Sequence, residues 1–200
     1  MNNHYFHNNP NLDNKKHEIK FTLNGKHYRF LTSSGVFSKS HIDFGTKTLI
    51  DAISMKSGNE KLLDLGCGYG VIGITLKGQY PNLDVTQVDI NSRAVELTKE
   101  NSELNQINTK AFVSDGFSEL TGKMFDVIVL NPPIRSGKQN VFNLYKSAYE
   151  HLVSGGEFWI VIQKKQGAPS HHKFLQELFS EVEIVKRNKG YYIFKSKKGL

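Results

Sequence analysis

The sequence contains few of the residues that build disulfide scaffolds or membrane spans. One cysteine, Cys67, cannot form an internal disulfide, and its place inside a glycine-rich turn favours a small buried side chain over a catalytic thiol. No stretch approaches roughly eighteen consecutive apolar residues, which excludes an apolar spanning helix. The first residues, MNNHYFHNNPNLDNKK, lack the apolar centre of a signal peptide. We therefore expect a cytoplasmic protein with no membrane segment.

Negative charge is scarce at both ends of the chain, whose net charge is +7. Residues 1–61 hold nine Lys and Arg against five Asp and Glu, and residues 164–200 hold nine against three. The middle, residues 62–163, holds eight against eleven. Basic flanks around a mildly acidic centre favour a polyanionic partner such as RNA, with an ordinary basic surface as the alternative.

Length and local composition predict one domain with a short tail. Residues 1–17 are polar and aperiodic, so we expect them to be disordered, and residues 18–200 are long enough for one well-packed domain. The tail histidines have no carboxylate or cysteine partners at ligand spacing, so no metal site is expected. Within residues 18–45, Asn24-Gly25 between two alternating segments predicts a β-hairpin, followed by a loop on the substrate side.

The residues LLDLGCGYGVIGI, numbers 62–74, predict a buried strand that runs through a glycine turn into a helix. Gly66, Gly68 and Gly70 can adopt positive φ or allow a ligand to approach the main chain. Two ligands compete for this turn, because Gly68-x-Gly70-x-x-Gly73 also matches the dinucleotide fingerprint. The carboxylate of Asp64 would repel a pyrophosphate but suits the ammonium group of a methionine moiety, which favours S-adenosylmethionine.

Alternating strands and helices follow this turn. Strands are expected from residue 62 and at residues 84–90, 111–113, 125–130 and 157–163, helices at 45–55, 71–78, 92–104, 140–152 and 170–180, and a closing antiparallel hairpin at 182–185 and 191–194. This order predicts an α/β Rossmann-like fold: a seven-stranded, mostly parallel sheet with helices on both faces, plus the N-terminal β-hairpin. Gly155-Gly156 is expected to be the turn before the strand at 157–163.

Ligands of such sheets gather beyond the carboxyl ends of the strands. Asp89 ends its strand and is placed to accept from both ribose hydroxyls. Asp115 follows the next strand, where it could accept from an adenine amino group with Phe117 packed nearby, or simply form an Asp-Gly turn. Earlier in the chain, Phe37 is either a stacking platform or a plug under its loop, and Asp43 is either a helix cap or a site carboxylate.

The strand at 125–130 stops at Asn131-Pro132-Pro133-Ile134. Each proline fixes its own φ and restrains the residue before it, so we expect an extended loop with free carbonyl groups. The carbonyls of Asn131 and Pro132 could then accept the two N–H groups of a planar amine and aim its lone pair at the methyl group of the cofactor. Arg135 and Lys138 suit phosphate or guanine contacts, or are solvated loop charges.

Together, DxGxGxG at 64–70 and NPPI at 131–134 resemble the class I S-adenosylmethionine-dependent methyltransferases that modify exocyclic amino nitrogens. The longer context, GVFS at 35–38, residues 43–45 and NPPIRSGK, is similar to the ribosomal RNA guanine-N2 methyltransferase family, and the likeness covers residues 18–200. In that family a second, degenerate half often precedes the catalytic half, and these 200 residues do not contain such a half. The resemblance implies the cofactor residues Asp64, Gly66, Cys67, Gly68, Gly70, Asp89, Ile90, Asp115, Gly116 and Asn131, the catalytic residues Asn131, Pro132, Pro133 and Ile134, and the substrate residues Phe37, Arg135 and Lys138.

The sequence therefore predicts an S-adenosylmethionine-dependent methyltransferase that acts on guanine N2 in ribosomal RNA. Relatives with an aromatic residue at the position of Ile134 stack it on adenine, cytosine or a glutamine amide, and Ile134 cannot stack in that way. The nearest alternatives are the same chemistry on a protein glutamine amide or a small molecule. A binding factor for RNA or ribosomes that does not catalyse a reaction, and an NAD-dependent oxidoreductase, are further alternatives.

Overall fold

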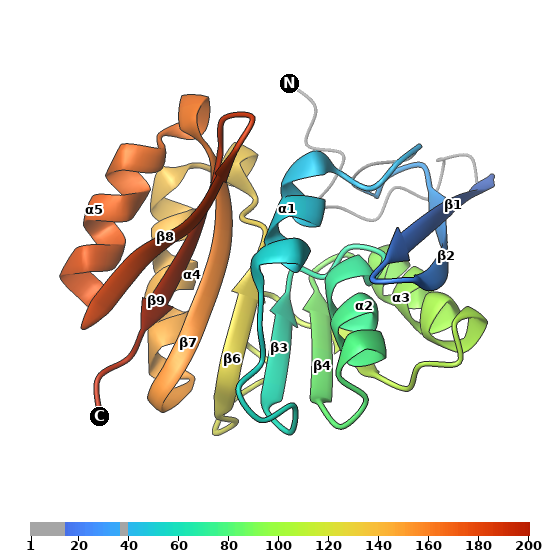
Figure 1. Cartoon of the computed structure of the whole chain (residues 1–200), viewed down its shortest axis with the longest axis horizontal. Helices are drawn as coiled ribbons and strands as arrows, with labels where there is room; N and C mark the ends of the chain where they lie inside the picture. The colour runs from blue at the N-terminus through green and yellow to red at the C-terminus, as the bar shows by residue number, and fades with distance from the viewer. Residues whose placement is uncertain (1–14, 37–39) are drawn as a thin grey trace.

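A computed structural model describes residues 15–36 and 40–200 (Figure 1). Most of the predicted tail, and Phe37 with its proposed stacking role, lie outside the described residues. The first strand begins at Lys16, which is two residues before the predicted start of the domain. Among the described residues, no helix is long and apolar enough to cross a membrane.

The predicted sheet is confirmed. Its seven strands lie in the order β5-β4-β3-β6-β7-β9-β8, and all neighbouring pairs are parallel except those of β9 with β7 and with β8. The strands are β3 (Lys61–Leu65), β4 (Asp84–Asp89), β5 (Lys110–Val113), β6 (Phe125–Leu130), β7 (Leu152–Gln163), β8 (Glu181–Asn188) and β9 (Tyr191–Lys197). Because β3, β4, β5 and β6 are parallel, their carboxyl ends meet at one edge, which is the upper edge in Figure 1.

Helices cover both faces of the sheet, as the sequence predicts. The helices are α1 (Phe44–Ala52), α2 (Val71–Gln79), α3 (Ser92–Leu104), α4 (Lys138–Glu150) and α5 (Ala168–Leu178), with short 3₁₀ turns η1 (Ile134–Ser136) and η2 (Lys164–Gln166). Successive residues of the central strands point to opposite faces, so Val127 and Val129 pack beneath α1, α2 and α3, whereas Ile128 and Leu130 pack beneath α4 and α5. The result is a three-layer domain with one core on each side of the sheet.

The N-terminal hairpin is confirmed and forms a separate two-stranded sheet. Strands β1 (Lys16–Leu23) and β2 (Lys26–Ser33) are joined by Asn24 and Gly25, both at positive φ. The outer edge of β2 is paired with side chains of α3: the amide of Asn101 both donates to and accepts from the backbone of Leu31. These contacts fix the hairpin beside the carboxyl edge of the large sheet (Figure 1).

Several predicted boundaries differ from the structure, among them the start of β7 and the starts of α4 and α5. Gly155-Gly156 is not a turn before β7 but part of a bulge within it, because Phe125 pairs with Leu152 while Val127 pairs with Glu157. Helices α4 and α5 each begin two residues earlier than predicted. Helix α5 can begin before Ser170 because Pro169 lies in its first turn. A backbone N–H at that position would have no partner within the helix, so the proline does not interrupt it.

Candidate active site

The glycine turn lies at the carboxyl end of β3 and is fixed to the neighbouring strand. The backbone N–H groups of Gly66 and Cys67 both donate to the carbonyl of Val88 in β4, at 2.8 and 2.9 Å. Gly66, Gly68 and Gly70 have φ of 69°, 57° and 91°, which confirms the predicted positive φ. The turn is therefore a rigid loop that directs its backbone beyond the edge of the sheet.

Two of these glycines have different surroundings. A Cβ on Gly70 would lie 2.9 Å from side-chain atoms of Ile74 and Thr98, so this glycine is required by packing within the protein. A Cβ on Gly68 would meet no protein atom within 4 Å. Gly68 therefore borders open space, where a ligand can approach the main chain.

Asp64 lies beneath the turn and is almost completely buried, with 1% of its surface exposed. Its Oδ2 accepts from the backbone N–H of Gly73 at 3.0 Å, whereas its Oδ1 has no partner among the described residues. Burial raises the pKa of Asp64 to about 7, against the opposing effect of the Gly73 N–H, and the charge of Asp89 raises it further. This carboxylate is ready to interact with a cationic group.

Asp89 ends β4, as predicted, and supports the glycine turn directly. Its Oδ2 accepts from the N–H of Gly68 and its Oδ1 accepts from the N–H of Asn91, each at 2.9 Å. Burial raises the pKa of Asp89, while N–H groups of Asn91, Gly68 and Ile90 oppose that shift. Each carboxylate oxygen can accept a second hydrogen bond, so these contacts leave capacity for a hydroxyl ligand.

Two apolar side chains lie exposed beside Asp89. Ile90 is 41% exposed, and Val113 at the end of β5 is 45% exposed. Val113 is paired with Asp89 in the sheet, so both apolar groups lie at the carboxyl ends of β4 and β5. Exposed aliphatic surface at a ligand-binding edge suits a flat, weakly polar ring.

Asp115 and Gly116 follow β5 in a tight turn. Asp115 is exposed, its backbone carbonyl accepts from Ser118 N–H at 3.1 Å, and Gly116 has φ of 54°. Phe117, which was expected to pack near Asp115, points into the protein. Phe117 is buried in the core beneath α4, with its ring stacked on His151 at a centroid distance of 4.4 Å.

Asn131, directly after β6, is held by Thr46, a residue that was not predicted from the sequence. Its Nδ2 donates to the hydroxyl of Thr46 at 3.0 Å, across 85 residues of sequence. The Thr46 hydroxyl lies 3.4 Å from Asp43 Oδ2, to which it donates, and the Thr46 N–H donates to the same oxygen at 3.0 Å. Asp43 is thus the N-cap of α1. The spacing Asp43-x-x-Thr46 was the sequence signal for this contact, because it places the Thr46 hydroxyl in the first turn of the helix, beside the capping carboxylate.

This chain of hydrogen bonds sets the orientation of the Asn131 amide. Because the Thr46 hydroxyl donates its hydrogen bond to Asp43, its oxygen is left to accept from the Nδ2 of Asn131. The Oδ1 of Asn131 is then directed away from Thr46 and makes no hydrogen bond with the described residues. A carbonyl oxygen is therefore presented at the same edge as the glycine turn.

The loop after Asn131 differs from the prediction. It is not extended with free carbonyls, because the carbonyl of Pro132 accepts from Ile134 N–H and that of Pro133 accepts from Ser136 N–H, both at 2.9 Å. The first bond closes a γ-turn centred on Pro133, whose φ and ψ are -76° and 72°, and the second belongs to the 3₁₀ turn η1. The proline spacing alone did not reveal either turn. A carbonyl oxygen has two lone pairs, so Pro132 retains one acceptor position.

Comparison with known proteins then gives the family. The model of the methyltransferase small domain matches residues 27–195. The chain belongs to the methyltransferase small domain family. This membership confirms the predicted enzyme class, a methyltransferase, with S-adenosylmethionine as its cofactor.

Individual relatives of this methyltransferase are similar over different shares of their length. The uncharacterized protein YbxB of Bacillus subtilis strain 168 is 46% identical over 200 residues, covering 99% of this chain and 100% of that protein. The ribosomal RNA small subunit methyltransferase C of Haemophilus influenzae strain PittGG is 34% identical over 167 residues, covering 82% of this chain and 49% of that protein. The chain thus spans about half the length of this second relative.

A solved structure has a similar fold. The 16S rRNA N2-guanine methyltransferase RsmC of T. thermophilus, in complex with AdoMet and guanosine, has a TM-score of 0.82 and 25% identity. The match covers 94% of this chain and 51% of that one. This likeness confirms the predicted Rossmann-like methyltransferase fold.

The remaining predicted residues of the methyltransferase lie around this edge. Cys67 is buried, and burial together with the charges of Asp89 and Asp64 raises the pKa of its thiol, which agrees with a packing role. Ile134 packs against the core under α4, Arg135 is exposed, and the Nζ of Lys138 lies 5.3 Å from the ring of Phe142. Among residues 15–36 and 40–200, no three metal-ligating side chains come together.

Proposed function

We propose that this methyltransferase transfers a methyl group to the exocyclic N2 amino group of guanine in small-subunit ribosomal RNA. The observation that carries the proposal is the Asn131 amide, whose Nδ2 is held by Thr46 so that Oδ1 is left as an acceptor beside the glycine turn. The relatives named as ribosomal RNA small subunit methyltransferase C and the guanosine bound to the T. thermophilus structure support the choice of acceptor.

The site residues fit S-adenosylmethionine at three places. The unpartnered Oδ1 of Asp64 suits the positive charge of the methionine moiety, with the buried carboxylate ionised when that charge is present. Gly68 leaves room for close approach, and Asp89 retains acceptor capacity for the ribose hydroxyls. Ile90 and Val113 offer an apolar surface for adenine, with Asp115 and Gly116 at its border.

When bound, the cofactor supplies an electrophilic methyl group on a sulfonium. The amino nitrogen of guanine is a weak nucleophile because its lone pair is delocalised into the ring. Asn131 Oδ1 and the free lone pair of the Pro132 carbonyl accept its two N–H groups and thereby fix the direction of the lone pair. Pro133 and Ile134 hold this acceptor pair in the η1 turn.

Placement supplies most of the acceleration in this scheme. Orientation of two reactants contributes roughly 7–11 kcal/mol in favourable intramolecular cases. The two acceptor bonds strengthen as positive charge develops on the nitrogen, which stabilises the transition state further. The bond from the methyl carbon to sulfur breaks as its bond to nitrogen forms, and the extra proton on nitrogen then leaves to solvent, so no buried general base is required.

Three features around the site support this choice of acceptor. Ile134 is aliphatic and partly buried, so it offers no aromatic face for a stacked adenine or cytosine. Arg135 follows Ile134 in the chain and is exposed. Its side chain suits a contact with a phosphate or with the edge of guanine. A basic protein surface adds a sequence-independent attraction for RNA.

The test uses labelled S-adenosylmethionine with three acceptors: protein-free ribosomal RNA, intact small ribosomal subunits and a protein extract, all from cells that lack this gene. We expect label in RNA or subunits, recovered as N2-methylguanosine after nuclease digestion. Label in protein alone would transfer the same chemistry to a glutamine amide, which has a similar planar nitrogen. Absence of label from every acceptor would contradict the proposed activity on macromolecules.

A further inference from the structure

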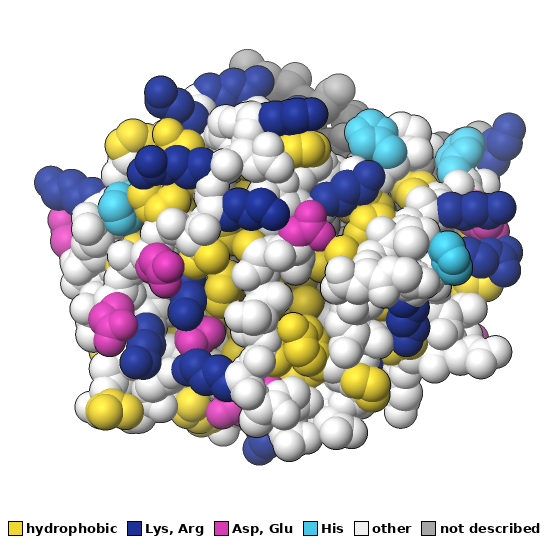
Figure 2. Space-filling model, in the orientation of Figure 1, with side chains coloured by type: hydrophobic (Ala, Val, Ile, Leu, Met, Phe, Trp, Pro, Cys, Tyr) yellow, Lys and Arg dark blue, Asp and Glu magenta, His cyan; other side chains and the backbone are white. Residues whose placement is uncertain are grey.

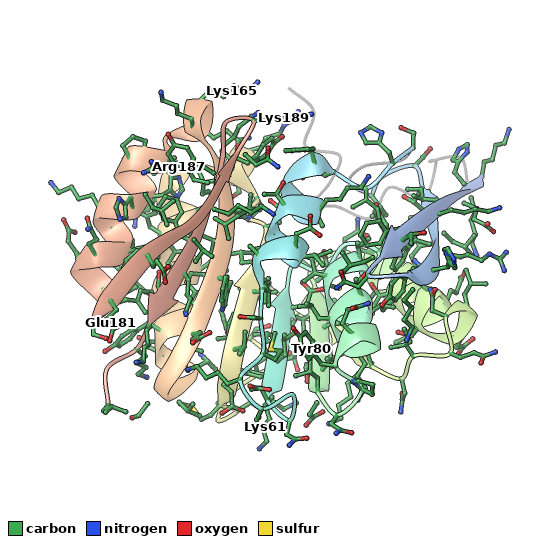
Figure 3. The ribbon with its side chains drawn as sticks, in the orientation of Figure 1. Lys61, Tyr80, Lys165, Glu181, Arg187 and Lys189 are labelled. Atoms are coloured by element: carbon green, nitrogen blue, oxygen red, sulfur yellow. The ribbon has the colours of Figure 1, made fainter. Side chains whose placement is uncertain are left out.

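Four exposed cations form a cationic ridge beside the site: Lys164, Lys165, Arg187 and Lys189. Lys164 and Lys165 lie in η2 after β7, and Arg187 and Lys189 lie at the end of β8 and in the β8–β9 turn. Figure 3 labels Lys165, Arg187 and Lys189 together at the upper edge, and Figure 2 shows Lys and Arg side chains gathered along that edge. We propose that this cationic ridge binds the phosphate backbone of the RNA substrate, an inference that rests on the proposed function.

The ridge is a fixed surface rather than a set of independent side chains. The N–H of Lys164 donates to the carbonyl of Gly190 at 2.7 Å, which joins η2 to the β8–β9 turn. Gln163 and Asn188 both pair with Tyr191 in the sheet. The backbones of the two segments are therefore held side by side, so their cations lie on one continuous surface that can contact the phosphates of one strand.

The charge of the ridge is not neutralised within the described part of the chain. None of the ion pairs among residues 15–36 and 40–200 includes a ridge residue. In the N-terminal hairpin, by contrast, Lys16 pairs with Glu100 at 2.6 Å and Arg29 pairs with Glu18 at 2.7 Å. Residues 184–200 contain no Asp or Glu at all. The ridge is thus a basic surface whose charge is available to a phosphate.

The ridge also borders the methyl-transfer site. The Nζ of Lys189 lies 5.0 Å from the centre of the Phe44 ring, and that ring lies 5.6 Å from the ring of Tyr191. Phe44 opens helix α1, in which Thr46 holds the Asn131 amide. An RNA strand bound on the ridge is therefore guided toward Asn131, with the aromatic pair between the two.

The β8–β9 turn supplies an independent observation. Lys189 has φ of 47° and Gly190 has φ of 81°, nearly the values of Asn24 and Gly25 in the β1–β2 turn, 49° and 77°. Both are two-residue hairpin turns, in which Asn followed by Gly is the favoured sequence and lysine is strained. The chain thus uses the favoured residue in one turn and a cation in the other, and strain of this kind is typical of functional positions.

Two triple variants test the ridge with the same loss of charge. The ridge variant carries Lys164→Gln, Lys165→Gln and Lys189→Asn, and the control carries Lys61→Gln, Lys110→Gln and Lys123→Gln. The control lysines lie at or just before the first residues of β3, β5 and β6, at the opposite edge of the sheet, where Figure 3 labels Lys61. Binding to a protein-free transcript of 16S ribosomal RNA is measured between low and moderate KCl without cofactor, and methyl transfer is measured with the cofactor saturating.

Each phosphate contact changes the slope of log affinity against log salt by about 0.7–0.9, so the ridge variant should bind RNA with a slope smaller by about 2–3. Its affinity at about 0.1 M salt should fall roughly 100-fold, with KM for RNA raised in parallel. The control variant should remain within about threefold of the wild type, and both should bind S-adenosylmethionine as the wild type does. Equal losses in both variants, or none in the ridge variant, would overturn the ridge as the RNA surface.

A single substitution separates charge from folding. Lys189→Asn places the favoured residue in the turn, so its melting temperature should equal or exceed that of the wild type while its RNA affinity falls. A lower melting temperature would show a structural role for Lys189 and contradict the proposal. If the wild type transfers no methyl group to RNA but its RNA binding depends on the ridge, the proposed function is refuted and the ridge proposal stands. If it methylates RNA but its RNA binding does not depend on the ridge, the proposed function stands and the ridge proposal is refuted.

Discussion

Replacement of Thr46 by valine tests how the Asn131 amide is oriented. Valine has the shape of threonine but lacks the hydroxyl that accepts from Asn131 Nδ2 at 3.0 Å. The amide then loses the bond that distinguishes its nitrogen from its oxygen. Its Nδ2 is left without this acceptor next to position 46, where the threonine of the wild type is only 8% exposed. An unsatisfied group in such a place costs about 1–3 kcal/mol. We therefore expect kcat to fall by roughly 5- to 150-fold, because a tenfold change in rate corresponds to about 1.4 kcal/mol.

The assay is single-turnover methyl transfer to ribosomal RNA, together with calorimetry of S-adenosylmethionine binding. Thr46→Val should reduce the rate with little change in cofactor affinity, and Thr46→Ser, which keeps the hydroxyl, should recover most of the rate. Loss of cofactor affinity at an unchanged rate would refute the reasoning, because Thr46 would then contact the cofactor instead of orienting Asn131. An unchanged rate and affinity in Thr46→Val would show that the amide is oriented by other groups.

Two further substitutions address the cofactor side. Asp64 has a pKa raised to about 7, so between about pH 4 and pH 7 the native state binds more protons than the unfolded chain, and the free energy of unfolding falls as pH rises, by at most about 4 kcal/mol. Asp64→Asn should flatten this dependence in urea titrations at about pH 4.5, near the lower end of this window, and at about pH 7.5, just above it. An equal change in unfolding free energy between the two pH values in both proteins would contradict the assignment. Gly68→Ala should weaken S-adenosylmethionine binding by about tenfold or more and lower stability by about 1–2 kcal/mol. The control is Gly25→Ala, at a residue with φ of 77° and equally open space around it. This control should lose the same stability but bind the cofactor normally. Equal cofactor affinity in both alanine variants would place the cofactor elsewhere.

The fold was predictable because its signals are local. The glycine turn, the apolar strands and the Asn24-Gly25 hairpin each express their conformation within a few residues, and alternation of strands with helices then predicts the parallel sheet. The gathering of Asp64, Asp89 and Asn131 at one edge followed from the same topology. These residues lie at or next to the carboxyl ends of neighbouring strands, so their proximity needed no knowledge of side-chain contacts.

The errors arose where a tertiary contact or a competing local bond decides the outcome. Thr46 could not be paired with Asn131 from sequence, since 85 residues separate them and the contact depends on how α1 packs. The Pro132 carbonyl is not free as predicted, because it accepts the γ-turn bond from the Ile134 N–H, which forms in spite of the two prolines. The partner of Phe117 was not predictable either, because its stacking on His151 is a tertiary contact.

The central claim is best tested by the nucleosides of small-subunit ribosomal RNA after reaction with labelled S-adenosylmethionine. RNA from cells that lack this gene is incubated with the wild-type protein or with Asn131→Ala, digested and separated. The account predicts label in N2-methylguanosine with the wild type, and nearly none with Asn131→Ala although that variant binds the cofactor within a few-fold of the wild type. Label in any other nucleoside, or undiminished transfer by Asn131→Ala, would contradict it.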